Sequence, residues 1–138
     1  MNRFWKIVVL CAAVLAAAGA QAQVWPTKPI RWIVPFPAGG QLDVVARLVA
    51  ERLSPVLGQP IVVEAKPGAD GNIGTEQVAR AAPDGYTWLA ASPPTTIQPS
   101  VRPTTLRFDP LRDFEPVALI GTSPFLFVVP ASLPVGNL

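Results

Sequence analysis

IRWIVPFPAGGQLDVVARLV, at residues 30–49, holds two hydrophobic patterns separated by a pair of glycines. The first five residues form a short, largely apolar and β-prone run that Pro35 closes, which is typical of a buried strand. After Gly39 and Gly40 the apolar residues recur at helical spacing. The stretch is therefore predicted to pass from a strand, through a glycine loop, into an amphipathic helix.

The predicted helix has distinct apolar and charged faces. Its apolar residues are Leu42, Val45, Leu48, Val49, Leu53 and Val56. Asp43, Arg47 and Glu51 follow one another at i,i+4 spacing on another face, where opposite charges can pair. Gly58 is a suitable C-terminal cap, whereas Pro55 lacks a backbone donor and is expected to distort the last turn.

Strand and helix patterns continue along the chain. Further short strands are predicted at residues 61–64, 86–91, 117–120 and 125–129. Asn72 could cap a second helix, in which Glu76 and Arg80 would pair at i,i+4. Residues 92–103 are so rich in Pro, Thr and Ser that neither helix nor strand is predicted there. Strands alternating with amphipathic helices predict an α/β fold with a mostly parallel sheet and flanking helices.

Residues 1–22 have the pattern of a cleavable signal peptide. Two basic residues precede an apolar run over residues 7–18, and Ala-Gln-Ala at residues 20–22 supplies a small-x-small cleavage motif. Cleavage is expected before Gln23, and the apolar run is too short to span a bilayer permanently. We therefore expect an exported protein that is not inserted in the membrane after cleavage.

Composition excludes several classes of function. Two of the 11 basic residues lie in the expected signal peptide, so the remainder of the chain carries nine basic and nine acidic side chains. It has neither the excess charge nor the basic cluster that nucleic acid or an anionic membrane surface requires. With no His, and Cys11 as the only Cys, His-based triads, His-ligated metals and disulfides are excluded. No metal or cofactor is predicted.

The sequence resembles a known family. WPTKPIR at residues 25–31, followed by a strand and PFPAGG at residues 35–40, is similar to the start of mature Bug-family proteins, the solute receptors of tripartite tricarboxylate transporters. Further motifs of that family are DVVAR (43–47), LGQP (57–60), PGA (67–69), GNIGT (71–75), APDGYT (82–87) and DFEPV (113–117).

The resemblance implies a periplasmic protein with two lobes that close around a small carboxylate and deliver it to the membrane permease subunits, without catalysis. Family members are longer than this chain. Residues 23–138 are therefore expected to form the first part of lobe 1, with the second lobe absent.

Ligands of open α/β sheets bind beyond the carboxyl ends of the strands, here the loop after residue 34 and the segment after residue 91. In the first loop, glycines can bring backbone N–H groups close to a carboxylate, and the next helix offers its positive dipole end. The alternative is a tight turn in which the glycines only satisfy backbone geometry. Candidate ligand-binding residues of this loop are Phe36, Ala38, Gly39, Gly40, Gln41 and Asp43.

Two of these residues are ambiguous or depart from the family pattern. Asp43 stabilises the first helical turn whether or not it touches a ligand. The family usually has a small residue and then Thr or Ser before this Asp, whereas Gln41 and Leu42 stand here. A hydroxyl contact is lost, and Gln41 could change the preferred ligand.

The second candidate group is Ser92, Thr95 and Thr96, in a segment where the family has a small, polar turn entering a helix. Their hydroxyls could contact the ligand, or they could be solvated loop and cap residues. Pro93 and Pro94 stiffen this segment and remove two N–H donors.

Two rival functions remain open. Ser92 or Asp43 could serve an enzyme as nucleophile or base, but the sequence offers no His and no GxSxG motif to support either role. Alternatively, the chain could be a truncated, non-functional remnant of a receptor, because a half-lobe leaves sheet edges and an apolar face uncovered.

Overall fold

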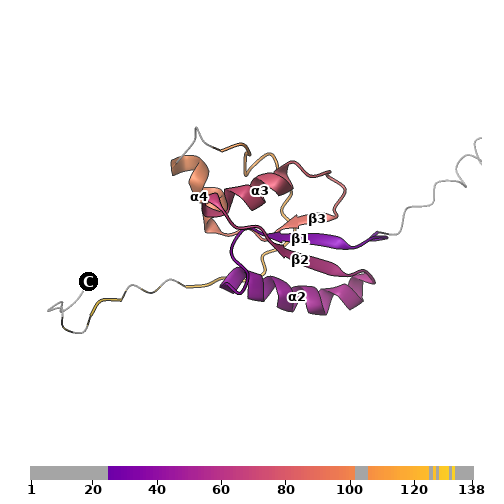
Figure 1. The fold of residues 1–138 in the computed structure, drawn as a ribbon, viewed down its shortest axis with the longest axis horizontal. Helices are drawn as coiled ribbons and strands as arrows, with labels where there is room; N and C mark the ends of the chain where they lie inside the picture. Colours follow the sequence, from indigo (N-terminus) through magenta and orange to yellow (C-terminus); the bar gives the residue numbers. More distant parts are fainter. Residues whose placement is uncertain (1–24, 102–105, 125, 127, 131, 133–138) are drawn as a thin grey trace, which may run out of the picture.

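The computed structural model describes residues 25–101, 106–124, 126, 128–130 and 132. Its three strands are β1 (Ile30–Val34), β2 (Ile61–Ala65) and β3 (Thr87–Leu89). They form a parallel sheet in the order β2-β1-β3. Helix α2 (Gln41–Leu57) covers one face, and α3 (Asn72–Ala79) and α4 (Pro93–Val101) lie on the other side, as Figure 1 shows. The predicted α/β fold with a parallel sheet and flanking helices is confirmed.

The core forms between β1 and helix α2. Alternate residues of β1 point towards the helix, because successive side chains of a strand face opposite sides of the sheet. Ala46 and Ala50 are the buried residues of α2 in this cluster, and their small size lets the helix approach the strands closely. The buried cluster comprises Ile30, Trp32, Val34, Ala46, Ala50, Ile61 and Ala90.

Helix α2 has nearly the predicted bounds, and its buried face agrees in part with the predicted apolar face, because Leu42, Val49 and Leu53 pack against the core. Leu48 and Val56, which belonged to the predicted apolar face, are 58% and 78% exposed. Asp43, which was assigned to the charged face, is 2% exposed. Ala46 and Ala50 are the most deeply buried apolar residues of the helix, at 0% and 5% exposure. Gly58 ends the helix with a φ of 69°, as expected of a C-terminal cap, and Pro55 does not end it early.

Helix α3 and strand β3 differ from the prediction in their details. Asn72 is not a cap: it is the first residue of α3, and Gly71 occupies the N-cap position with a φ of 91°. Glu76 and Arg80 form the predicted ion pair. Strand β3 is shorter than predicted.

Helix α4 forms where no element was predicted. Pro93 and Pro94 occupy its first turn, where the missing N–H groups have no intrahelical acceptor anyway, so two prolines are compatible with a helix there.

The predicted strand at residues 117–120 is wrong. These residues lie outside the sheet, with Val117 and Leu119 more than four-fifths exposed. High β-propensity reflects packing against neighbouring strands, and no strand of the described part pairs with this segment. Of the predicted strand at 125–129, the described residues 126, 128 and 129 are also not in a strand, and the other two lie outside the described residues. The predicted signal peptide lies entirely outside them.

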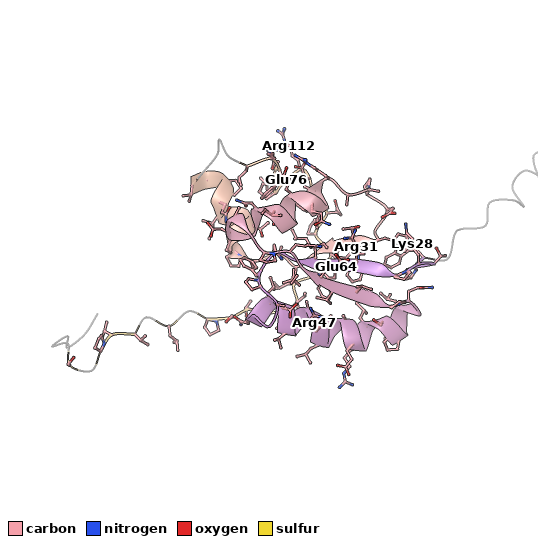
Figure 2. All side chains as sticks on the ribbon, in the orientation of Figure 1. Lys28, Arg31, Arg47, Glu64, Glu76 and Arg112 are labelled. Carbon is pink, nitrogen blue, oxygen red and sulfur yellow. The ribbon has the colours of Figure 1, made fainter. Side chains whose placement is uncertain are left out.

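Charged side chains form pairs across the sheet and its ends. The Arg31 guanidinium donates to both carboxylate oxygens of Glu64, at 2.9 and 3.0 Å, and Figure 2 shows the two side chains beside each other. The Lys28 ammonium lies 3.0 Å from an Asp84 oxygen. Both cations belong to the amino-terminal half of β1 or the segment before it, away from the carboxyl edge of the sheet.

Candidate functional site

The loops after β1 and β2 pack directly against each other at the carboxyl edge of the sheet. A Cβ on Gly71 would lie 3.3 Å from the Phe36 ring and 3.3 Å from the Pro35 carbonyl oxygen. A Cβ on Gly74 would lie 3.0 Å from the Pro35 Cα and 2.9 Å from the Lys66 carbonyl oxygen, so a side chain would not fit there without a shift of the backbone. The absence of side chains at these glycines therefore lets the two loops come together.

Helix α4 is attached to the same edge through the loop after β2. The Gln98 side-chain amide donates to the Asp70 carbonyl oxygen at 2.8 Å. Asp70 lies in the short 3₁₀ turn η1 (Ala69–Gly71) that precedes α3. The segments that follow the three strands thus meet at the carboxyl edge of the sheet.

A buried carboxylate organises the loop after β1. Asp43, in the first turn of α2, accepts a hydrogen bond from the Gly39 N–H at 2.9 Å. The Arg47 guanidinium donates to both oxygens of the same carboxylate, at 2.9 and 3.0 Å. These contacts connect the loop, the first turn and the second turn of the helix.

The same contacts lower the pKa of Asp43. The hydrogen bonds from Arg47 contribute most, and the Gly39 N–H contributes next, because both stabilise the charged carboxylate. The carboxylate raises the pKa of Arg47 in turn. The pair is therefore ionised at neutral pH.

In this structure the N–H groups of both glycines are hydrogen-bonded within the chain. The Gly39 N–H is bonded to Asp43, and the Gly40 N–H donates to the Pro37 carbonyl at 3.3 Å. Within the described residues, the N–H groups of Ala38, Gln41 and Leu42 have no acceptor. The donors left available to an anion belong to the residues that flank the glycines.

Gly39 still needs to be a glycine. Its φ is 80°, a left-handed conformation that other residues rarely adopt, and a Cβ there would meet nothing within 4 Å. The constraint at this position is therefore the backbone conformation, because there is enough space for a side chain.

Phe36 and Gln41 occupy the two ends of the loop. Phe36 is half-buried, with its ring near Gly71. The exposed Gln41 side chain donates to the Ser123 hydroxyl at 3.2 Å, which brings the chain after residue 121 to the start of α2.

The second candidate group is differently arranged. The Ser92 hydroxyl is buried and has no partner in the described part of the chain. Thr95 is 8% exposed, and its hydroxyl accepts the Ser92 N–H at 3.5 Å. The exposed Thr96 hydroxyl donates to the Pro93 carbonyl at 3.0 Å. No hydrogen bond among the described residues joins this group to Gly39 or Asp43.

Arg47 and Gln98 contribute contacts that the sequence interpretation did not assign to the site. The i,i+4 spacing of Asp43 and Arg47 signalled an ion pair but not its burial or its link to Gly39. No sequence pattern pointed to Gln98, because its partner lies 28 residues away.

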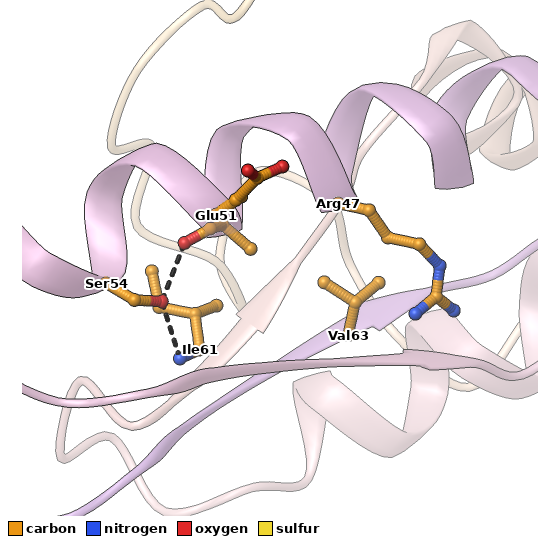
Figure 3. Close-up of a pocket in the computed structure, with 6 residues that line it drawn as sticks. Arg47, Glu51, Ser54, Ile61 and Val63 are labelled. Carbon is orange, nitrogen blue, oxygen red and sulfur yellow. Dashed lines mark hydrogen bonds between the residues drawn. The ribbon is translucent and has the colours of Figure 1, made fainter.

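A shallow hollow of about 270 Å³ lies between α2 and the edge strand β2, and Figure 3 shows the residues around it. The Ser54 hydroxyl accepts the Ile61 N–H at 3.0 Å and donates to the Ala50 carbonyl at 2.6 Å. Of Gly39, Asp43 and Arg47, Arg47 lines this hollow. Ser54 thus attaches the helix to the sheet edge.

The sequence matches a solute-binding receptor family. Residues 45–138 match the family described as the tripartite tricarboxylate transporter family receptor, TctC. The chain belongs to this family, and the predicted resemblance is confirmed.

Relatives of known sequence agree. The chain is 38% identical to the protein BugT of Bordetella pertussis, over the whole of this chain and 43% of that protein. It is 43% identical to a UPF0065 protein of Bordetella bronchiseptica, over 90% of this chain and 37% of that protein. The chain therefore spans well under half the length of these relatives.

Solved structures show the same fold. One is described as a periplasmic transporter, with a TM-score of 0.60 and 50% identity over 64% of this chain and 30% of that one. Another is MatC from Rhodopseudomonas palustris with bound malate, with a TM-score of 0.60 and 37% identity over 70% of this chain and 33% of that one. In the residues that our structure describes, no helix is long and apolar enough to cross a membrane.

Proposed function

We propose that this chain supplies the first-lobe part of a periplasmic receptor for a small carboxylate, which the receptor delivers to the permease subunits of a tripartite tricarboxylate transporter. The observation that carries the proposal is the arrangement of the loop after β1. The Asp43–Gly39 contact fixes this loop, and the N–H groups of Ala38, Gln41 and Leu42 are left without acceptors at the start of α2.

Unpaired N–H groups at a helix N-terminus, together with the helix dipole, form a suitable environment for an anion. A ligand carboxylate could accept from these donors without a Lys or Arg beside it. The malate-bound MatC structure supports a dicarboxylate as the first ligand to try.

The second loop has a smaller role in this proposal. Thr96 has an exposed hydroxyl and is the member of the second group that we assign to the ligand. Thr95 holds the start of α4, because its hydroxyl accepts the Ser92 N–H, and the Ser92 hydroxyl is buried away from a ligand.

Binding without catalysis is part of the proposal. The Asp43 carboxylate, the candidate base, already accepts from Gly39 and Arg47. The Ser92 hydroxyl, the candidate nucleophile, is buried. Residues 1–22 act as the signal peptide in this account, and the chain from residue 23 enters the periplasm.

Calorimetric titration with malate tests the proposal, with the diamide of malate as the neutral control. We expect heat of binding and a raised Tm with malate, since a ligand that binds only the folded state stabilises it by RT ln(1 + [L]/Kd), and no effect with the diamide. Equal binding of both compounds, or no binding of malate, succinate, citrate or aspartate, would contradict a carboxylate site in this part of the receptor.

The remnant hypothesis is the second candidate, because the chain after residue 114 exposes large apolar side chains. They are Val117, Leu119, Leu126 and Val128, each at least 80% exposed. A remnant is expected to associate through this segment, whereas a working receptor is expected to be monomeric by size-exclusion chromatography with light scattering.

A further inference from the structure

Asp43 places a negative charge where the proposed ligand carboxylate would bind. The Asp43 side chain lies in the first turn of α2, one residue beyond the N–H donors of Gln41 and Leu42. Two carboxylates at one helix N-terminus repel each other and compete for the same donors and dipole. An uncompensated charge on Asp43 would therefore weaken binding of an anionic ligand.

Arg47 compensates this charge through contacts that do not involve the loop itself. Its guanidinium donates to both oxygens of Asp43 from the side of the hollow between α2 and β2. The Arg47 side chain is 52% exposed, whereas that of Asp43 is 3% exposed. Arg47 therefore neutralises a buried acid while it stays in contact with solvent.

Arg47 forms an ion pair with one of two acidic residues at helical spacing. Asp43 and Glu51 lie four residues before and after it, and a helix permits both pairings. Within the part of the chain that the structure describes, Arg47 pairs with Asp43, and Glu51 has no ion pair. The arrangement thus favours the acid that also holds Gly39.

We propose that Arg47 is a positioning residue of the carboxylate site: it holds the Asp43 carboxylate against the Gly39 N–H and cancels its charge, so that the free N–H groups can serve an anionic ligand. This inference rests on the proposed function. It assigns to Arg47 an effect on ligand affinity without contact with the ligand.

Three variants separate charge compensation from simple structural support. Arg47→Gln leaves the charge of Asp43 uncompensated, and we expect it to weaken malate binding about tenfold or more. The double variant Asp43→Asn with Arg47→Gln removes both charges and keeps an oxygen that can accept the Gly39 N–H, so most of the affinity should return. Arg47→Lys retains the charge but not the two parallel hydrogen bonds, and should bind with intermediate affinity.

The control is Arg52→Gln, which removes an exposed arginine from the same helix. It should bind malate like the original protein. Amide hydrogen exchange of Gly39 without ligand supplies a second measurement, and Arg47→Gln should accelerate it while Arg52→Gln does not.

The outcomes distinguish this inference from the proposed function. If the original protein binds malate and Arg47→Gln binds equally well, the inference is overturned. It is also overturned if the double variant binds as weakly as Arg47→Gln, since Arg47 would then be structural only. If the original protein binds no carboxylate, the proposed function fails and the inference fails with it, whatever the exchange of Gly39 shows.

Discussion

The loops that follow β1 and β3 leave the same edge of the sheet, but their polar groups are used differently. After β1, the buried Asp43 carboxylate, paired with the half-exposed Arg47, holds the loop, and the N–H groups beside the glycines have no acceptor among the described residues. After β3, two prolines remove donors, and the hydroxyls of Ser92 and Thr95 are buried. The comparison shows that polar composition alone does not identify a ligand loop, because its donors must also be free.

Asp43→Ala should have the largest effect. It removes the acceptor of the Gly39 N–H and the partner of Arg47 at once, so both the fold and the loop lose support. We expect a Tm several degrees lower and loss of measurable malate binding, by thermal denaturation and calorimetry. An unchanged malate affinity would show that the fixed loop is not the site.

Acidification should produce part of the same effect. The pKa of Asp43 is lowered by Arg47 and Gly39, so its contribution to stability is complete above the unfolded-state pKa of about 3.9 and is lost as pH falls through the lower folded value. Glu64 and Asp84 contribute with the same sign. Urea denaturation between about pH 2 and pH 6 should therefore show a shallower pH dependence for Asp43→Asn. Parallel curves would contradict the assigned role of the carboxylate.

Gly39→Ala should have a smaller, more specific effect. Gly39 and Gly58 have φ values of 80° and 69°, and an added Cβ meets nothing within 4 Å at either. Each alanine substitution should therefore cost about 1 kcal/mol of stability through backbone strain alone.

The two glycine variants should differ in binding. Gly39→Ala should weaken malate binding up to about fivefold, because about 1 kcal/mol of strain in the ligand loop corresponds to about that factor, about 1.4 kcal/mol being tenfold. The matched variant Gly58→Ala, at the other end of α2, should leave it unchanged. If the two glycine variants bind malate with equal affinity in calorimetry, Gly39 is not part of the ligand site.

The smallest effect is expected in the second loop. Thr96→Val removes one exposed hydroxyl and should weaken malate binding only about threefold, in keeping with a single neutral hydrogen bond. Ser92→Ala removes a buried hydroxyl that has no partner in the described part of the chain, so it should leave affinity unchanged and stability equal or higher. A larger loss for Ser92→Ala would mean that the second loop rearranges around the ligand.

The sequence predicted best where a pattern is local. The strand Ile30–Val34, the glycine loop and the cap at Gly58 follow from short-range patterns, and all appear in the structure. The buried face of α2 was predicted in part: Leu42, Val49 and Leu53 pack against the core, whereas Leu48 and Val56 are exposed. The most deeply buried apolar positions belong to Ala46 and Ala50.

The remaining discrepancies arise from contacts distant in sequence. Residues 117–120 have a strand composition, but pairing requires a neighbour that their own sequence does not specify. Within the candidate site, the glycine loop could be predicted, but the use of the Gly39 N–H by Asp43 could not. That contact depends on the burial of a carboxylate, which the helical periodicity placed on a face other than the apolar one.

The most direct test of the account is to follow the backbone amide signals of the ¹⁵N-labelled protein by NMR during titration with malate. The account predicts saturating shifts concentrated at Ala38, Gln41 and Leu42, with smaller changes near Thr96 and none with the diamide. Shifts confined to α4, or no saturable shift in the loop after β1, would contradict the claim that this loop binds a carboxylate.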